Sequence, residues 1–137
     1  MTKEKQRDLL LFGIPFILTF STYLKTVCPT IYTGDSGELS FAIASLGIAH
    51  PPGYPLLTLL GKFVIQLIPG NPAYILNIFS AVLAASSAGT AAFVLRYIFF
   101  KKPQRYDIQP VILSMAFATI WGFSNSLWST AVGIEVY

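Results

Sequence analysis

The residues best suited to chemistry in this chain lie in two short stretches. Asp35 and Glu38 stand three residues apart in the sequence TGDSGEL, and His50 and Tyr54 belong to the sequence HPPGYP. A carboxylate can remove the proton of an attacking hydroxyl group, and imidazole and phenol groups can donate hydrogen bonds to a phosphate or a sugar. Long uncharged runs flank both stretches, so we expect the chemistry of the chain to take place here.

Structural roles are also open for these residues. An acidic residue followed three positions later by Glu resembles a capping box, so Asp35 and Glu38 can simply begin a helix. The prolines of HPPGYP oppose helix formation, so that stretch can be a plain hairpin in which His50 caps the preceding helix. These roles leave Gly34 and Gly37 unexplained, and glycine permits the close backbone approach that a ligand can require.

The composition is that of a membrane protein. Of the 137 residues, 54% are hydrophobic and only 11% are charged, whereas soluble domains have about 25% charged residues. The basic residues fall in short clusters beside the apolar runs, a pattern that indicates membrane orientation and not a nucleic-acid partner. Cys28 is the only cysteine, which excludes an internal disulfide, and we interpret it as a small apolar residue near a helix end.

The long apolar runs predict an all-α, polytopic membrane protein. A helix that crosses a bilayer needs about 20 largely apolar residues. Three runs qualify as transmembrane helices: residues 9–27, 72–100 and 108–128. Within the second of them, the sequence AASSAG over residues 84–89 predicts a face of small residues that permits close helix packing.

The run Leu56–Ile68 is too short for a crossing and is amphipathic. Its polar residues Thr58, Lys62 and Gln66 recur every four positions, which places them near one face of a helix. We expect this helix to lie in the membrane interface, together with a second short helix over about Leu39–Ile48.

The distribution of Lys and Arg predicts the orientation. The N-terminus and the loop after the second predicted crossing are both rich in basic residues, so both are expected to be cytoplasmic. An even number of crossings must separate them, so the amphipathic run is not a crossing. The third predicted crossing then returns the chain to the outer side, so Glu135 and Tyr137 are expected on the same side as the acidic pair. The predicted order is cytoplasmic at residues 1–8 and 101–107 and outer at residues 28–71 and 129–137.

Several segments of the chain resemble the start of one known family. This family of multi-spanning membrane proteins, catalogued as a domain of unknown function, includes an animal endoplasmic-reticulum protein O-mannosyltransferase and looks like part of the glycosyltransferase C superfamily. The resemblance covers nearly the whole chain. It is carried by Thr33–Leu39, Leu46–Leu56, Pro69–Asn71, Trp128, Ala131 and Glu135–Tyr137.

The resemblance implies sugar transfer at the acidic loop. Members of the superfamily take a sugar from a polyprenyl-phosphate carrier on the outer or luminal side, using an acid in the first non-cytoplasmic loop. Asp35 is then expected to be the general base and Glu38 to orient the acceptor or support Asp35. His50, Tyr54 and, more weakly, Lys62 are expected to contact the donor phosphate or sugar. The sugar is expected to be of the mannose type and the acceptor a protein serine or threonine hydroxyl, or another glycan. No metal or other cofactor is implied, although two neighbouring acids can hold a metal.

The family also implies a size and a location. Its members are several times longer, so we expect this chain to be an N-terminal fragment that is inactive alone. The protein is expected to be integral and multi-pass, in the plasma membrane of a prokaryote or the endoplasmic reticulum of a eukaryote, with the bilayer, the donor and the acceptor as partners. Two other interpretations stay open: a transporter or channel segment whose acids bind ions, and a non-catalytic membrane scaffold.

Overall fold

The computed structural model describes residues 3–99 and 108–135, and every regular element in these two ranges is a helix. The predicted all-α class is therefore confirmed. The predicted cytoplasmic loop over residues 101–107 and the position of Tyr137 lie outside the described residues. The helices are α1 (Lys3–Thr26), α2 (Ser36–Ser45), α3 (Pro55–Leu67), α4 (Pro72–Phe99), α5 (Gln109–Gly122) and α6 (Asn125–Ala131).

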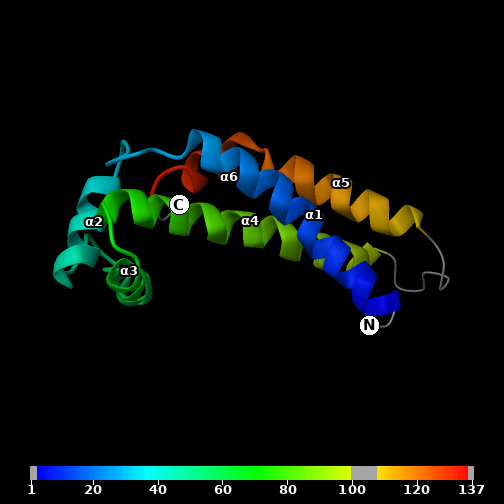
Figure 1. Cartoon of the computed structure of the whole chain (residues 1–137), viewed down its shortest axis with the longest axis horizontal. Coiled ribbons are helices and arrows are strands. Elements are labelled where there is room, and N and C mark those ends of the chain that lie inside the picture. The colour runs from blue at the N-terminus through cyan, green and yellow to red at the C-terminus, as the bar shows by residue number, and fades with distance from the viewer. Residues whose placement is uncertain (1–2, 100–107, 136–137) are drawn as a thin grey trace.

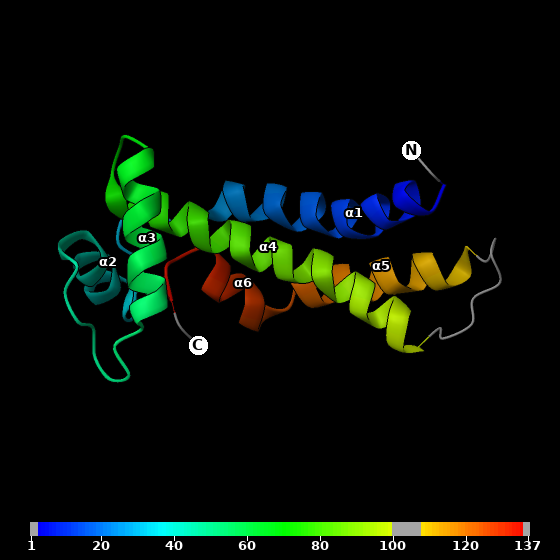
Figure 2. The same ribbon diagram turned by 90° about the horizontal axis from the view of Figure 1, so that it is seen from below.

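Three long helices form the body of the molecule. α1, α4 and α5 run side by side along its longest dimension, as Figure 1 and Figure 2 show. Small residues allow this close approach, because a Cβ at Gly89 would collide with Phe12 and one at Gly122 would collide with Thr19. The small-residue face predicted over residues 84–89 is thus confirmed, and it permits the van der Waals packing by which helices associate in a bilayer. The fully buried alanines of α4 are Ala81, Ala85, Ala88 and Ala92.

Among the described residues, two helices are long and apolar enough to cross a membrane, Glu4–Thr26 and Pro72–Phe99. A third candidate is the pair α5 and α6, which are bent by 63° at the break between them. The structure thus differs from the single continuous helix predicted over residues 108–128. The break arises because Ser124 takes an extended conformation, with φ −61° and ψ 145°, and its side chain caps a new helix at the amide of Leu127.

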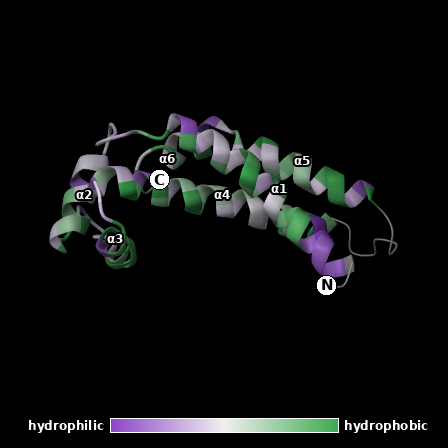
Figure 3. Ribbon diagram, in the orientation of Figure 1, coloured by the Kyte–Doolittle hydropathy of each residue, from purple (hydrophilic) through white to green (hydrophobic). Residues whose placement is uncertain are grey.

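The two ends of the bundle differ in character. Figure 3 shows the N-terminal turns of α1 as hydrophilic, and the C-terminal end of α4 and the N-terminal end of α5 lie at this same end. α2 and α3 gather at the opposite end of the bundle (Figure 1). The basic start of α1 and the acidic start of α2 are therefore separated by the length of the long helices, as the predicted order of crossings requires.

α3 lies across the end of α4 (Figure 2) and turns an apolar side outward. Thr58 and Gly61 are its buried residues, and the amine of Lys62 donates to the main-chain oxygen of Ala44 in α2. Gln66 is exposed, because residues four apart in a helix drift by about 40° around the axis. Of the predicted polar face, Thr58 and Lys62 therefore pack against the rest of the molecule and Gln66 does not. An outward apolar face suits a lipid surface better than water. Its exposed residues include Leu56, Leu59, Phe63 and Leu67.

After α6 the chain returns to the end of the bundle that carries α2. The main-chain N–H of Cys28 donates to the oxygen of Val132 at 2.9 Å, and the carboxylate of Glu135 lies against Gly34. The predicted return of Glu135 to the neighbourhood of the acidic loop is confirmed.

Candidate functional site

The first half of the site is the N-terminal turn of α2. Gly34 has φ +74°, a left-handed conformation that glycine adopts without strain, and it leads the chain into the helix. Asp35 is the N-cap residue and Glu38 lies in the first turn. Ser36 is fully buried, and its hydroxyl oxygen accepts a hydrogen bond from the main-chain N–H of Tyr32 at 3.2 Å. This anchor holds two carboxylates that remain accessible, with 30% of the Asp35 side chain and 48% of the Glu38 side chain exposed.

The second half of the site is the HPPGYP turn between α2 and α3. Leu46 ends α2 in a left-handed conformation, with φ 55°, and the amide of Gly47 then bonds to the oxygen of Ala42 at 2.8 Å. The amide of Gly53 bonds to the main-chain oxygen of His50, also at 2.8 Å. These two reversals bring His50 back beside the first turn of α2.

Four of the five predicted site residues meet in one cluster. Oε1 of Glu38 accepts a hydrogen bond from the main-chain N–H of His50 at 2.6 Å, and Oε2 lies 3.2 Å from the ring nitrogen Nδ1. The other ring nitrogen, Nε2, lies 3.8 Å from Oδ2 of Asp35 and 3.5 Å from the Tyr54 hydroxyl. The rings of His50 and Tyr54 meet edge-on, with centroids 5.4 Å apart. His50 therefore stands between the two carboxylates, with one ring nitrogen toward each.

The two acids begin a helix as predicted, but the hydrogen bonds of a capping box do not form, and His50 does not cap α2. Asp35 makes no side-chain capping hydrogen bond at the start of α2, and Glu38 reaches His50 instead of the start of its own helix. The last carbonyls of α2 are bonded by the amides of Leu46 and Gly47 and not by His50. The amide of His50, twelve residues along the chain, competes for the Glu38 carboxylate, and leaving that amide unpaired would cost free energy.

Lys62 is the fifth predicted site residue. Among the described residues, its amine contacts Ala44 and not the cluster. Its amine donates to the main-chain oxygen of Ala44, near the C-terminal end of α2, where positive charge is favoured. The contact fastens α3 to α2 and so helps to hold the HPPGYP turn between them.

The cluster has the donor set of a cation site. Asp35, Glu38 and His50 each offer one ligand atom, and these atoms lie within 4.8 Å of one another. Carboxylate oxygens and imidazole nitrogens are ligands that Mn²⁺ and Zn²⁺ accept. In the arrangement described, Nδ1 of His50 and Oε2 of Glu38 face each other, so these two groups already satisfy one another.

Glu135 lies against the residue that precedes Asp35, although the residue types near Asp35 do not single it out. Its Oε1 lies so close to Gly34 that a Cβ there would collide with it. Two features of the sequence point to this neighbourhood: the predicted return of the chain to the outer side, and the place of Glu135 in the family resemblance. Neither one specifies the contact with Gly34.

Replacing Gly34 by Ala is expected to destabilise this end of the molecule. A residue with a Cβ pays roughly 1–2 kcal/mol for a left-handed backbone, and the new methyl group would push the Glu135 carboxylate aside. Thermal unfolding in detergent should show a lower midpoint for this variant. Gly13→Ala is the matched control, because nothing lies within 4 Å of a Cβ at that position. An unchanged midpoint for Gly34→Ala would contradict the described turn.

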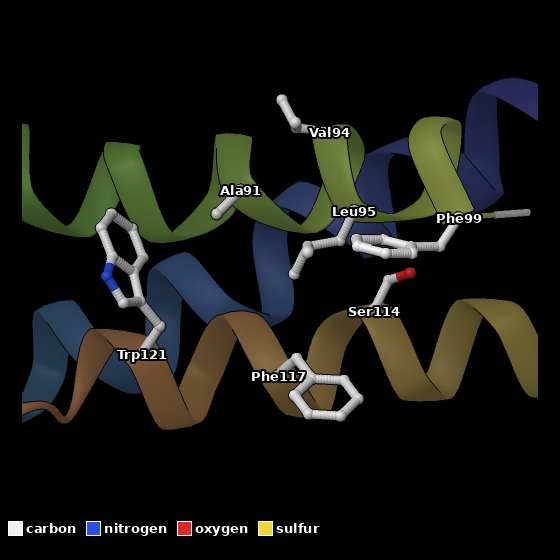
Figure 4. A pocket seen from close by; sticks show the side chains of 7 residues that line it. All are labelled: Ala91, Val94, Leu95, Phe99, Ser114, Phe117 and Trp121. Carbon is white, nitrogen blue, oxygen red and sulfur yellow. The ribbon is translucent and has the colours of Figure 1, made fainter.

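A cavity away from the acidic cluster has no acidic or basic side chain in its lining. It is an apolar groove of 650 Å³ between α4 and α5, shown in Figure 4. Phe99 and Trp121 lie toward its two ends, and the side chains of Leu95 and Ser114 lie between them. The acidic cluster therefore remains the candidate site for chemistry.

Comparison with known proteins identifies the family of the chain. The family model described as "Protein O-mannosyl-transferase TMEM260 N-terminal domain" matches residues 35–137. The chain is 35% identical over 123 residues to protein O-mannosyl-transferase TMEM260 of Mus musculus, a match that covers 89% of this chain and 16% of the mouse protein. It is 45% identical over 56 residues to protein O-mannosyl-transferase tmem260 of Dictyostelium discoideum, which covers 41% of this chain and 7% of that protein.

The chain matches only a part of each of these longer relatives. No solved structure matches the chain. The chain spans 16% of the length of the mouse relative, so the two share one N-terminal region and not a whole protein. The family model covers most of the chain, including the acids at the start of α2, the HPPGYP turn and the returning segment. This chain belongs to the family of the protein O-mannosyl-transferase TMEM260 N-terminal domain.

Proposed function

We propose that the chain forms the N-terminal, catalytic-loop part of an integral membrane glycosyltransferase. The whole enzyme moves a sugar of the mannose type from a polyprenyl-phosphate carrier to an acceptor hydroxyl, such as that of a protein serine or threonine. The observation that carries this proposal is the cluster of Asp35, Glu38 and His50 at one end of an apolar helical bundle. It is joined through Tyr54 to the N-terminal end of α3, a helix that exposes an apolar face. A lipid-linked sugar needs both an apolar surface and hydrogen-bonding groups. The name of the mouse relative supports the sugar and the protein acceptor.

Asp35 is proposed as the general base. In the transfer, the acceptor oxygen forms a bond to the anomeric carbon while the bond from that carbon to the phosphate oxygen breaks. The polyprenyl phosphate leaves with the bonding electrons, and the hydroxyl proton passes to the Asp35 carboxylate. That carboxylate is partly exposed, so a substrate can reach it, and it sits at a helix N-terminus, where negative charge is favoured.

Two of the other residues, His50 and Tyr54, are proposed to bind the leaving phosphate or the sugar. Glu38 is proposed to hold His50 in position. Glu38 holds His50 by both its main chain and its ring, and this fixes the direction of Nε2. Nε2 and the Tyr54 hydroxyl lie together on the side of Asp35, where they can contact the donor phosphate or sugar. Hydrogen-bonding groups placed where negative charge develops stabilise the transition state.

In this proposal the site faces the outer or luminal side of the membrane, and α3 lies in the interface without crossing. Single cysteines in a Cys28→Ser background test the order of crossings. Ile48, which is 92% exposed, and Pro69 flank α3, whereas Gln6 lies near the start of α1. Ile48→Cys and Pro69→Cys are expected to react with a membrane-impermeant maleimide from the same side, and Gln6→Cys from the opposite side. Reaction of Pro69→Cys from the side of Gln6→Cys would mean that α3 crosses the bilayer.

Mannosyl transfer is the direct test of the proposed function. Because the chain spans 16% of the mouse relative, the assay uses a chimera in which this chain replaces the matching region of that relative. Membranes that contain the chimera, from cells without the endogenous enzyme, should move labelled mannose from polyprenyl-phosphate mannose to a peptide with serine and threonine. Variants of the chimera at Asp35 and Glu38 then test the roles proposed for these two residues in the transfer.

A further inference from the structure

Asn77 is a fully buried amide in the largely apolar helix α4. Burying an amide costs free energy unless its groups are hydrogen-bonded, and the bonds of this side chain go to segments outside α4. Nδ2 donates to the main-chain oxygens of Cys28 and Thr30, both at 2.8 Å. Oδ1 accepts a hydrogen bond from the main-chain N–H of Ile134 at 2.9 Å. One side chain therefore ties α4 both to the loop before α2 and to the segment after α6.

These two segments also contact each other directly. The main-chain N–H of Cys28 donates to the oxygen of Val132 at 2.9 Å. Gly133 packs so closely on Tyr32 that a Cβ at residue 133 would collide with the tyrosine side chain. The hydrogen bonds of Asn77 and these two contacts fix the register of one segment on the other. Figure 2 shows the segment after α6 passing beside α4 toward the end that carries α2 and α3.

This register brings Glu135 to the proposed site. Its Oε1 lies so close to Gly34 that a Cβ there would collide with it, and Asp35 follows Gly34 directly. An ionised carboxylate only accepts hydrogen bonds, and sugar hydroxyl groups donate them. A third carboxylate beside a site for sugar transfer is therefore suited to hold the sugar by its hydroxyl groups.

We infer that Asn77 is a positioning residue and Glu135 a sugar-binding residue of the proposed site. Asn77 fixes residues 132–135 on the loop before α2, which holds the Glu135 carboxylate against Gly34, the residue before Asp35. There the carboxylate accepts hydrogen bonds from the hydroxyl groups of the transferred sugar. This inference rests on the proposed function for the identity of the ligand, but the fixed register is a property of the chain itself.

Hydrogen exchange of the chain in lipid nanodiscs tests the register without reference to activity. Asn77→Leu keeps the size of the side chain and removes its amide, so residues 132–135 should exchange at least about tenfold faster. Ser80→Ala is the matched control, because the Ser80 hydroxyl donates from α4 to the oxygen of Thr130 at 2.8 Å. That control should leave the exchange of residues 132–135 unchanged. Unchanged exchange in Asn77→Leu would show that Asn77 does not fix the segment.

Kinetics of the chimera test the role of Glu135. Glu135→Gln is expected to raise the KM for polyprenyl-phosphate mannose by about tenfold, because it removes a charged acceptor of hydrogen bonds. Asn77→Leu should raise the same KM by a similar factor. The double variant should be no worse than either single variant, because Asn77 acts through Glu135. A defect in folding alone would lower the amount of active chimera and would leave KM unchanged.

The outcomes separate this inference from the proposed function. If Glu135→Gln leaves KM unchanged while Asp35→Asn abolishes transfer, Glu135 does not bind the sugar and only this inference fails. If the effects of Asn77→Leu and Glu135→Gln on KM are additive, Asn77 does not act through Glu135. If the unaltered chimera transfers no mannose, the proposed function fails and the sugar-binding role fails with it, whereas hydrogen exchange still decides whether Asn77 fixes the segment.

Discussion

Replacing Asp35 by Asn in the chimera is expected to abolish mannosyl transfer. Asparagine has nearly the same shape as aspartate but does not take up the proton of the acceptor hydroxyl. Loss of a positioned general base typically costs about 10²–10⁴ in rate, so transfer should fall to the level of membranes without enzyme. The first turn of α2 should survive, because Asp35 makes no side-chain capping hydrogen bond there. The measurement is the initial rate of label transfer per amount of chimera in the membrane.

Asp8→Asn is the matched control for this variant. Asp8 lies on α1 at the opposite end of the bundle, where its carboxylate is 3.6 Å from Arg7. The Asp8→Asn variant loses one negative charge, as Asp35→Asn does, and should leave the rate of mannosyl transfer unchanged. Full transfer by Asp35→Asn would exclude Asp35 as the base, and equal losses in both variants would point to a damaged fold and not to lost chemistry.

Replacing Glu38 by Gln is expected to lower kcat by about tenfold to a hundredfold. Glutamine has an NH₂ group in place of one carboxylate oxygen, so it still accepts a hydrogen bond from the His50 amide but no longer accepts one from Nδ1. The imidazole ring can then shift relative to Asp35 and Tyr54, and displacements of about 1 Å at a catalytic group cost up to about a hundredfold in rate. kcat, KM and the thermal midpoint should be measured on the same preparation.

Glu4→Gln is the control that separates this effect from a loss of helix stability. Glu4 lies in the first turn of α1, as Glu38 does in α2, so both variants remove a negative charge from a helix N-terminus. Glu4→Gln should leave kcat unchanged. If Glu38→Gln lowers the thermal midpoint without a specific loss of kcat, the loop serves folding alone, as the scaffold interpretation requires.

The helices could be predicted where their causes are local. The second long helix is predicted over residues 72–100 and observed over Pro72–Phe99, because an unbroken apolar run follows a proline that starts it. The helix expected from about Leu56 begins at Pro55 for the same reason. The bend between α5 and α6 could not be predicted from apolar length, because it depends on the single capping residue Ser124 inside an apolar run.

The candidate site could be predicted in part. Asp35 and Glu38 are neighbours in any helix that begins nearby, so their proximity follows from their spacing. The capping box was the wrong interpretation of that spacing, because the carboxylate of Glu38 has a better partner in His50, which the turns at Leu46 and Gly53 return to it. Lys62 is a basic residue close to the site in the sequence, yet its amine faces α2.

By itself the sequence determined that this protein is helical, suited to a membrane, and equipped with two acids before a rigid turn. Each of these properties follows from residues that are close together in the chain. Only the tertiary structure decided which groups face one another: Glu38 and His50, Asn77 and Ile134, Glu135 and Gly34. These pairs depend on how α1, α4 and the segments around them pack, and the free energy of packing is a sum over many weak contacts between residues far apart in the chain.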